Sequence, residues 1–357
     1  MTVARSILAA LSAAAVVSSL PAPTSQQLND PTYGPIPGES DTYNNYTGKA
    51  EPFPGNITAP INATSTGPAG PDDILFQNLL SAEWAIYSFY QQGVEAFSVE
   101  NFTDLGLPNT TYERIAEIRD NEAGHLRIFQ DQISSNSVKP GACKYNFGFN
   151  NAETYLALQV LLEVSSMAFL TGLVQQAKLN ATKGALVAIA EVESRHNTWA
   201  LIDVWGVNPF SGPSDTVYPY ANQVLDVTNQ FIVPGSCPSE NPVYPSPRQD
   251  LPPLSFNMST STGQPGSQID FVFLDDVNMP SFDSGKDYYA VFFHGVRNIT
   301  VPLDTKANSS VIPREFDAGR GIIMAVLADE EGAPTLESVV AGPVFLLEQP
   351  QELTRQI

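Results

Sequence analysis

Basic residues are scarce in this chain of 357 residues, which has 17 Lys plus Arg against 38 Asp plus Glu and a formal net charge of −21 at pH 7. Recognition of nucleic acids depends on clustered cations that neutralise phosphates. A chain with this charge balance offers no such cluster, so we expect no nucleic acid partner.

Long apolar runs are also missing from most of the sequence, and we expect no membrane span. Near the start, Arg5 precedes an apolar run of about thirteen residues, too few to cross a bilayer, which ends in small residues. This pattern is typical of a secretory signal peptide. We place the signal peptide at residues 1–20, with cleavage near residues 18–22; a retained anchor or amphipathic helix is the alternative.

Cysteine occurs only at Cys143 and Cys237, the number needed for one disulfide, which an oxidising secretory route allows. Two free thiols are the alternative. Nine acceptor sequons for N-glycosylation support the same route, at Asn45, Asn56, Asn62, Asn101, Asn109, Asn180, Asn257, Asn298 and Asn308. We therefore expect a glycoprotein that is secreted to the extracellular space or the cell wall.

The composition changes along the chain in a way that predicts separate domains. Residues 21–70 are rich in Pro, Gly, Ser, Thr and Asn and lack apolar periodicity, so we expect a flexible, glycosylated lead-in. Residues 71–210 have the periodicity of helices. Residues 211–253 form a loop and a Pro-rich linker, and residues 254–357 contain short β-branched runs separated by turn residues.

Four helices are expected within residues 71–210 from apolar residues spaced three and four apart. They are Asp72 to about Phe97, Thr110 to about Ser137, Asn150 to about Val174, and Thr182 to Trp205. The second and third begin with predicted capping boxes, in which Thr110 pairs with Glu113 and Asn150 with Glu153.

The links between these helices predict the topology of a four-helix bundle. Short links join the first helix to the second and the third to the fourth, whereas residues 138–150 are enough, at about 3.3 Å each, to run the length of the bundle. One long crossover of this kind is known from bundles that hold dinuclear metal sites. A bond between Cys143, in the crossover, and Cys237 would fix the crossover to the end of the bundle.

Short runs in the last hundred residues predict a small antiparallel β-sandwich. The expected strands are Ile269–Leu274, Tyr288–Phe293, Val296–Val301, Gly321–Leu327 and Ser338–Leu347.

The four expected helices share one unusual feature, which is glutamate and histidine on their buried faces. The second and fourth helices each have Glu and His three residues apart, and the first and third each have one Glu in an apolar stripe. This is the ligand pattern of di-iron and di-manganese bundles. The predicted ligands are Glu83, Glu122, His125, Glu163, Glu193 and His196.

Burying four carboxylates together is prohibitive without cations, so we expect two Fe or two Mn ions as cofactors. The alternative is a metal-free network of protonated carboxyls and imidazoles. Tyr87 and Tyr90 flank Glu83 along the first helix and are candidates for hydrogen-bond donors or radical partners. Glu153 and Glu191 are interpreted as structural, and His294 is given no role. The pattern assigns no catalytic residue.

On these motifs, residues 72–206 resemble the ferritin-like domain of fungal secreted proteins of the stress-response and late sexual development family, and plant desiccation-related proteins are similar. The succession of signal peptide, bundle and β-rich tail is similar more loosely. The resemblance implies an α+β multidomain fold in which a ferritin-like four-helix bundle is followed by a small antiparallel β-sandwich.

The predicted centre favours redox chemistry on O2 or peroxide, as an oxidase, a catalase-like enzyme or a ferroxidase, or on a small organic substrate. Stress or developmental protection is the expected setting. Iron storage in a closed shell is disfavoured, because a β-domain and glycans obstruct packing of identical bundles. The alternative function is a non-catalytic structural or protective glycoprotein of the cell wall or spore coat, on a metal-free scaffold. A third hypothesis is that the β-sandwich binds cell-wall carbohydrate.

Overall fold

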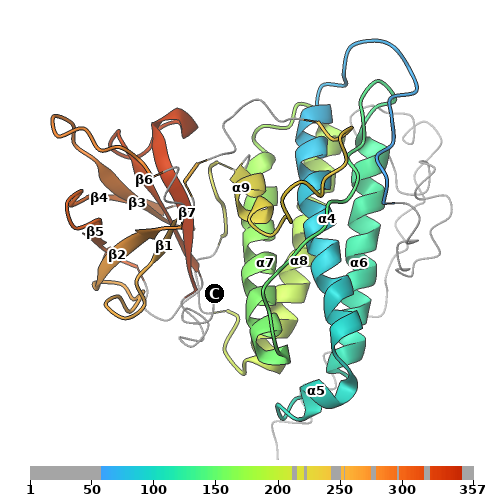
Figure 1. The fold of residues 1–357 in the computed structure, drawn as a ribbon, viewed down its shortest axis with the longest axis horizontal. Coiled ribbons are helices and arrows are strands. Elements are labelled where there is room, and N and C mark those ends of the chain that lie inside the picture. The colour runs from blue at the N-terminus through green and yellow to red at the C-terminus, as the bar shows by residue number, and fades with distance from the viewer. Residues whose placement is uncertain are drawn as a thin grey trace, which may run out of the picture.

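A computed structural model describes residues 58–210, 215–220, 223–242, 251–252, 254–274, 279–295, 297–316 and 322–347. The predicted signal peptide and the sequons at Asn45 and Asn56 lie outside these residues. Figure 1 shows two parts side by side, a bundle of long helices and a smaller part built of strands.

Four long helices form the bundle, as predicted. They are α4 (Asp73–Ala96), α6 (Thr111–Gln132), α7 (Ala152–Leu173) and α8 (Asn180–Trp199). The short helix α5 (Val99–Thr103) lies in the link between α4 and α6. Helix α8 continues as a π-helical turn, η1 (Ala200–Val204), and the helical path ends at Gly206, whose φ of 63° favours glycine. Helix α4 packs mainly on α6, and α7 on α8.

Two of the predicted helix starts are wrong in detail. Thr110 already has a helical backbone, with φ −80° and ψ −8°, and its side chain makes no capping hydrogen bond, because a capping side chain needs an extended backbone. Helix α7 is capped by Asn151 rather than Asn150: the Asn151 side chain accepts from the Thr154 amide at 2.8 Å.

Helix α6 ends five residues before the predicted Ser137. The buried Asp73 carboxylate explains this end, because it accepts from the Ser134 amide at 3.0 Å and from the Ser134 and Ser137 hydroxyls. These hydrogen bonds hold the pKa of Asp73 below its usual value although burial alone raises it. Residues 134–137 are thereby held as a turn at the start of α4.

The described part of the predicted lead-in is fixed to the crossover rather than flexible. Ile61 forms a β-bridge with Lys139. The Ala142 amide donates to the Thr58 carbonyl at 2.8 Å, and the Thr64 amide donates to the Ser135 carbonyl at 2.9 Å. The prediction failed here because Pro- and Ser-rich chain without a core of its own pairs with backbone supplied by a distant segment.

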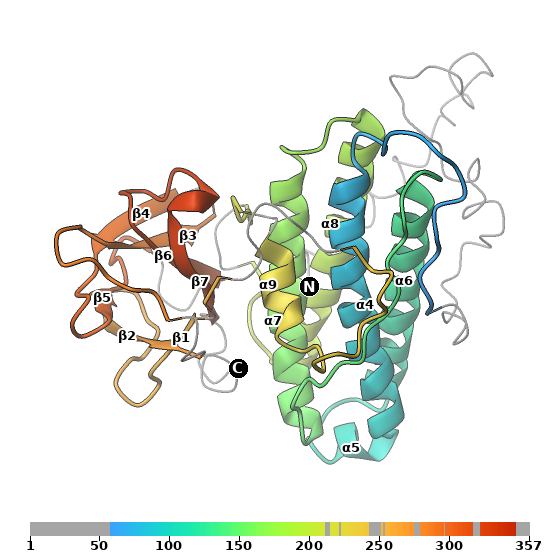
Figure 2. The same ribbon diagram turned by 45° about the horizontal axis from the view of Figure 1, so that its top comes forward.

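The predicted disulfide between Cys143 and Cys237 is present and joins the crossover to the chain beyond the bundle. Before Cys237 the chain forms a helix, α9 (Val224–Asn229), within the segment predicted to be only loop and linker. Figure 2 shows α9 lying across α7 beside α4.

Two antiparallel sheets form the C-terminal part, which confirms the predicted class. One sheet has the strand order β1-β2-β5, and the other has the order β4-β3-β6-β7. The strands are β1 (Leu254–Phe256), β2 (Gln268–Phe273), β3 (Tyr289–His294), β4 (Arg297–Pro302), β5 (Ser309–Val311), β6 (Ile322–Ala328) and β7 (Val339–Leu347). The three-residue strands β1 and β5 were not predicted. A core of aromatic and aliphatic side chains, among them Phe271 and Phe292, lies between the sheets.

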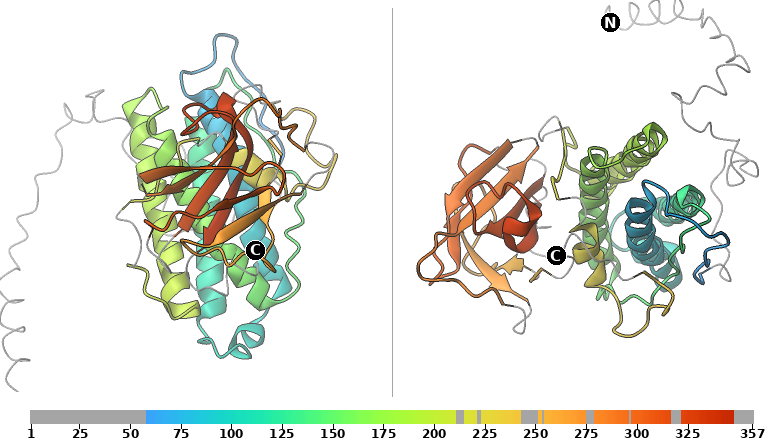
Figure 3. Two further views of the ribbon diagram at one scale, coloured as in Figure 1. Left: turned by 90° about the vertical axis from the view of Figure 1, so that its left-hand side faces the viewer. Right: turned by 90° about the horizontal axis from the view of Figure 1, so that it is seen from above.

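The other face of the four-stranded sheet packs against the bundle. Phe293 and Met324 belong to the same buried cluster as the bundle side chains, and the Phe169 and Phe345 rings, from α7 and β7, have centroids 6.4 Å apart. Seen from above, α7 lies between the sheets and the other long helices (Figure 3).

Helix α7 corrects the expectation that no segment is long and apolar enough to cross a membrane. It passes that test of length and composition, and 83% of its most apolar window is buried inside the structure. Helices and sheet cover it from both sides, so burial in the core accounts for an apolar sequence around the whole helix.

Candidate metal centre

The six predicted ligands converge in the middle of the bundle, and none is more than 5% exposed. One group surrounds His125, whose Nδ1 lies 2.9 Å from Glu122 Oε2, 3.2 Å from Glu83 Oε1 and 3.4 Å from Glu193 Oε1. Each of these four side chains offers an atom within 4.8 Å of the others, so the group can hold a metal ion.

A second group of the same composition surrounds His196. Its Nδ1 lies 3.1 Å from Glu122 Oε1, 3.4 Å from Glu163 Oε2 and 3.4 Å from Glu193 Oε2. The two groups share Glu122 and Glu193, and each adds one histidine and one further glutamate. The arrangement therefore has two equivalent halves with two carboxylates between them.

Helical spacing explains how the sequence builds this arrangement. On α6 and α8 the shared glutamate and the histidine are three residues apart, so both side chains leave the same face of the helix. Helices α4 and α7 add Glu83 and Glu163 from faces that are otherwise apolar. Each hairpin of two helices thus supplies one single glutamate and one Glu-x-x-His pair.

The polar atoms of this cluster are poorly satisfied by one another. Oε1 of Glu83 and of Glu122, and Oε2 of Glu163 and of Glu193, are buried without a hydrogen-bond partner among the described residues, as are both ring nitrogens of His196. His196 Nδ1 lies 3.1 Å from Glu122 Oε1, but the two are not aligned for a hydrogen bond. Buried polar atoms normally find partners, so these converging lone pairs fit metal ions.

Burial and mutual repulsion separate the four glutamates into two kinds. Burial first, and nearby carboxylates second, raise the pKa of Glu83 well above its usual value, and burial chiefly does the same for Glu163. For Glu122 and Glu193, burial alone raises the pKa, but the histidines lower it below the usual value. The shared glutamates are therefore the preferred anions of the metal-free cluster.

The histidines respond in the opposite sense. Burial alone lowers the pKa of both imidazoles, but the surrounding carboxylates raise it well above 6.5, led by Glu122 for His125 and by Glu163 for His196. The imidazolium and carboxylate forms of the cluster therefore stabilise each other, while burial favours the protonated forms of Glu83 and Glu163.

Of the two predicted tyrosines, Tyr90 contacts a ligand. Its buried hydroxyl donates to Glu163 Oε1, and burial followed by the charge of Glu163 raises the pKa of Tyr90 well above 10. Tyr90 therefore remains a hydrogen-bond donor. Tyr87 packs its ring edge-on against Trp84.

The residues interpreted as structural lie away from the centre. Glu153 is exposed in the first turn of α7. Glu191 is exposed on α8, where it lies 3.5 Å from Arg195. His294 is buried in the sheets, where its Nδ1 lies 2.9 Å from the Ile322 carbonyl oxygen.

Two polar residues of α7 on the same helix face as Glu163 were missed by the sequence reasoning. The Ser166 hydroxyl donates to Glu193 Oε1 at 3.4 Å. Gln159 is completely buried, and neither end of its amide has a partner among the described residues. Ser166 follows Glu163 by three residues and Gln159 precedes it by four, so both share its face of the helix. This spacing is the sequence signal that could have identified them.

Comparison with known proteins identifies the helical part. Residues 72–202 match the ferritin-like domain family. This match confirms the ferritin-like domain that the ligand motifs predicted. The chain is also similar to Protein rds1 of Schizosaccharomyces pombe (strain 972 / ATCC 24843), with 23% identity over 197 residues, which cover 53% of this chain and 47% of that protein. The chain thus spans about half the length of that relative.

Proposed function

We propose that the ferritin-like domain holds two divalent ions, iron or manganese, and acts on O2 or peroxide. The observation that carries this proposal is the pair of overlapping ligand groups that share Glu122 and Glu193. Each ion would receive three carboxylates and one imidazole, an oxygen-rich set that suits these metals. Four carboxylates also balance the charge of two divalent ions.

A bound pair of such ions supplies redox chemistry on small oxygen species. The protein contributes a fixed ligand cage from which water is largely excluded. The hydroxyl of Tyr90 orients the Glu163 carboxylate, and that of Ser166 orients Glu193, as hydrogen bonds to ligands commonly do in metal sites.

We further propose that the protein is a secreted or cell-wall glycoprotein that protects against oxidative or developmental stress. The disulfide supports an oxidising compartment. Of the seven sequon asparagines within the described residues, all are exposed except Asn308, which is half-buried. Exposure supports glycosylation, since the acceptor must be accessible. Carbohydrate binding by the sheets stays a prediction.

Metal analysis tests the centre. Protein prepared without chelator and reconstituted with Fe(II) or Mn(II) is expected to contain about two ions per chain. The double variant Glu122→Gln and Glu193→Gln, which removes both shared carboxylates, is expected to retain none. Glu191→Gln, an exposed change on α8, is the matched control and should bind as the unchanged chain does. Folded protein that takes up neither metal would refute the proposal.

Activity is measured on the same proteins. Consumption of hydrogen peroxide or uptake of O2 is expected from the metal-loaded chain and from Glu191→Gln, but not from the double variant. Equal activity in the folded double variant would remove the site from the reaction.

A metal-free structural or protective scaffold is the second candidate function. The observation that favours it is that each imidazole lies within 3.4 Å of three carboxylates, so these groups can balance one another's charge without a metal. Full stability and no metal uptake together would support this candidate.

A further inference from the structure

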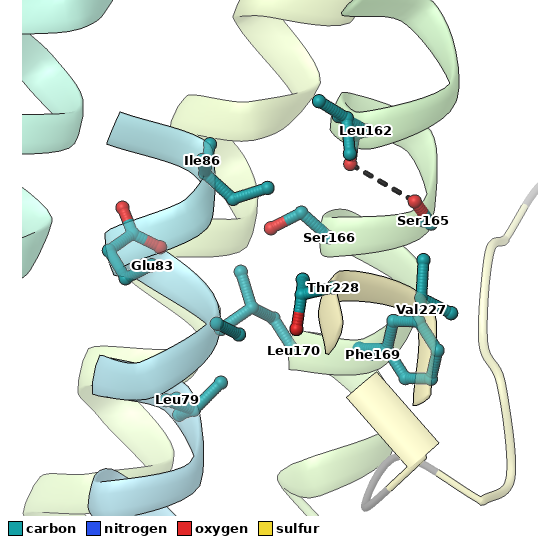
Figure 4. Close-up of a pocket in the computed structure, with 11 residues that line it drawn as sticks. Leu79, Glu83, Ile86, Leu162, Ser165, Ser166, Phe169, Leu170, Val227 and Thr228 are labelled. Atoms are coloured by element: carbon teal, nitrogen blue, oxygen red, sulfur yellow. Dashed lines mark hydrogen bonds between the residues drawn. The ribbon is translucent and has the colours of Figure 1, made fainter. Parts of the chain in front are cut away.

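A small cavity lies between α4, α7 and α9, next to one of the predicted metal ligands (Figure 4). Glu83, a predicted ligand, lines the cavity on α4, and Ser166, whose hydroxyl donates to the ligand Glu193, lines it on α7. Its volume is about 20 Å³, room for about one water molecule.

The walls of the cavity are mostly apolar. The helices of the bundle contribute Leu79, Ala82, Ile86, Leu162, Phe169 and Leu170. Helix α9 covers the side away from α8 with Val227 and Thr228, both almost fully buried. Among the described residues that line the cavity, Glu83 is the only ionisable one. A hydrated ion would therefore shed its water there at a high cost. A small uncharged molecule meets no such cost.

Helix α9 is held firmly in this position. After it, the Asn146 amide donates to the Phe231 carbonyl at 2.8 Å, and the Val233 amide donates to the Lys144 carbonyl at 2.9 Å. The disulfide to the crossover follows a few residues later. Before α9, the side-chain amide of Gln223 donates to the Gly342 carbonyl at 3.2 Å. Helix α9 is thus tied to the crossover at one end and to the sheet at the other.

We infer that this cavity is the route by which substrate reaches the centre, and that Val227 and Thr228 restrict that route to uncharged molecules the size of hydrogen peroxide or O2. The inference rests on the proposed function and narrows its substrate class. Organic substrates and alkyl hydroperoxides are too large for the route, and hydrated Fe(II) is too polar. The two residues act on specificity through size and do not touch the reacting atoms.

Thiol labelling of the metal-free protein tests the route. Both native cysteines are bonded to each other, so Ser166→Cys places a single free thiol at the inner end of the cavity. Its rate of reaction is measured with a small reagent, methyl methanethiosulfonate, and a bulky one, dithiobis(nitrobenzoic acid). Val187→Cys, at a position 55% exposed on α8, gives the reference rates.

The small reagent is expected to label Cys at position 166 much faster than the bulky one, relative to the reference thiol. Adding Val227→Ala and Thr228→Ala should raise the rate of the bulky reagent at least about tenfold. Thr228→Val, which keeps the size of the side chain, should change neither rate. Circular dichroism shows whether each variant is folded, and Thr228→Ala alone replaces the double change if that variant unfolds.

Three outcomes overturn the inference: equal relative rates for the two reagents with native α9, no effect of shortening the α9 side chains, and no labelling of any variant. Labelling requires no metal, so its failure is distinguishable from a failure of metal binding. If the loaded protein consumes hydrogen peroxide, the shortened variant should also gain activity toward tert-butyl hydroperoxide, while the unchanged chain should show little.

Discussion

Glu83 and Glu163 should make the metal-free protein less stable as the pH rises. In the folded chain their pKa is well above the usual 4.5, because burial and neighbouring charge disfavour the carboxylates. In the unfolded chain both ionise near the usual value. Above that pH the folded state binds two more protons than the unfolded state, so the free energy of unfolding falls with pH until the folded pKa is passed.

The magnitude follows from the number of protons. Each proton taken up on folding lowers the free energy of unfolding by about 1.4 kcal/mol per pH unit, so two lower it by about 2.7 kcal/mol per unit. The double variant Glu83→Gln and Glu163→Gln keeps two neutral side chains of similar shape and does not titrate there. Its stability relative to the unchanged chain should therefore rise by up to about 2.7 kcal/mol per pH unit above pH 4.5.

Denaturant unfolding with a chelator present, at pH values from about 5 to about 7, measures this difference. Titrating groups outside the cluster are common to both proteins and cancel. Loss of Glu163 also lowers the pKa of His196, which Glu163 raises, and this changes the stability difference in the same sense. Glu153→Gln together with Glu191→Gln removes two exposed carboxylates from α7 and α8, and this control should follow the pH profile of the unchanged chain. Parallel profiles for the buried double variant and the unchanged chain would refute the assigned protonation.

Three further predictions concern metal affinity and stability. Metal ions must displace the protons of the cluster, so the affinity for Mn(II), measured by titration calorimetry, should rise with pH; a flat profile would contradict the raised pKa of Glu83 and Glu163. Gly93→Ala should destabilise the protein by about 1–3 kcal/mol, because the new Cβ would lie 2.3 Å from the Tyr155 ring. In contrast, a Cβ at Gly184 would have nothing within 4 Å, so Gly184→Ala should stabilise α8 by up to about 1 kcal/mol. Thermal denaturation of the two variants measures both effects. Replacing Cys143 and Cys237 by Ser removes a disulfide between residues 94 positions apart. The free energy of unfolding, measured with denaturant, should fall by up to about 4–5 kcal/mol. An unchanged unfolding midpoint would contradict this prediction.

The centre was predictable from the sequence because helical periodicity is local. Glu122 with His125, and Glu193 with His196, share a face at any place where the chain is helical, and the apolar stripes around Glu83 predict its burial. The same helical spacing predicted that Tyr90 lies close to the ligands. Only the packed structure shows which glutamates belong to one ligand group and which are shared by both.

The remaining features depend on contacts between distant segments. Helix α9 has six residues, too few to show a period. Thr228 reaches the cavity because the disulfide and hydrogen bonds to the crossover and to the sheet hold α9 in place. The pairing of Ile61 with Lys139 has no local signal either. The early end of α6 results from a carboxylate on α4, Asp73, which no pattern within α6 could reveal.

The position of α7 between bundle and sheet links events in the two parts. A ligand that binds only the folded state stabilises every segment that unfolds together with its site. Because Phe169 and Phe345 are packed in one core across the boundary, ions held by the helices should also protect the strands from opening. Amide hydrogen exchange in β6 and β7 would then report on occupancy of a centre that neither strand touches.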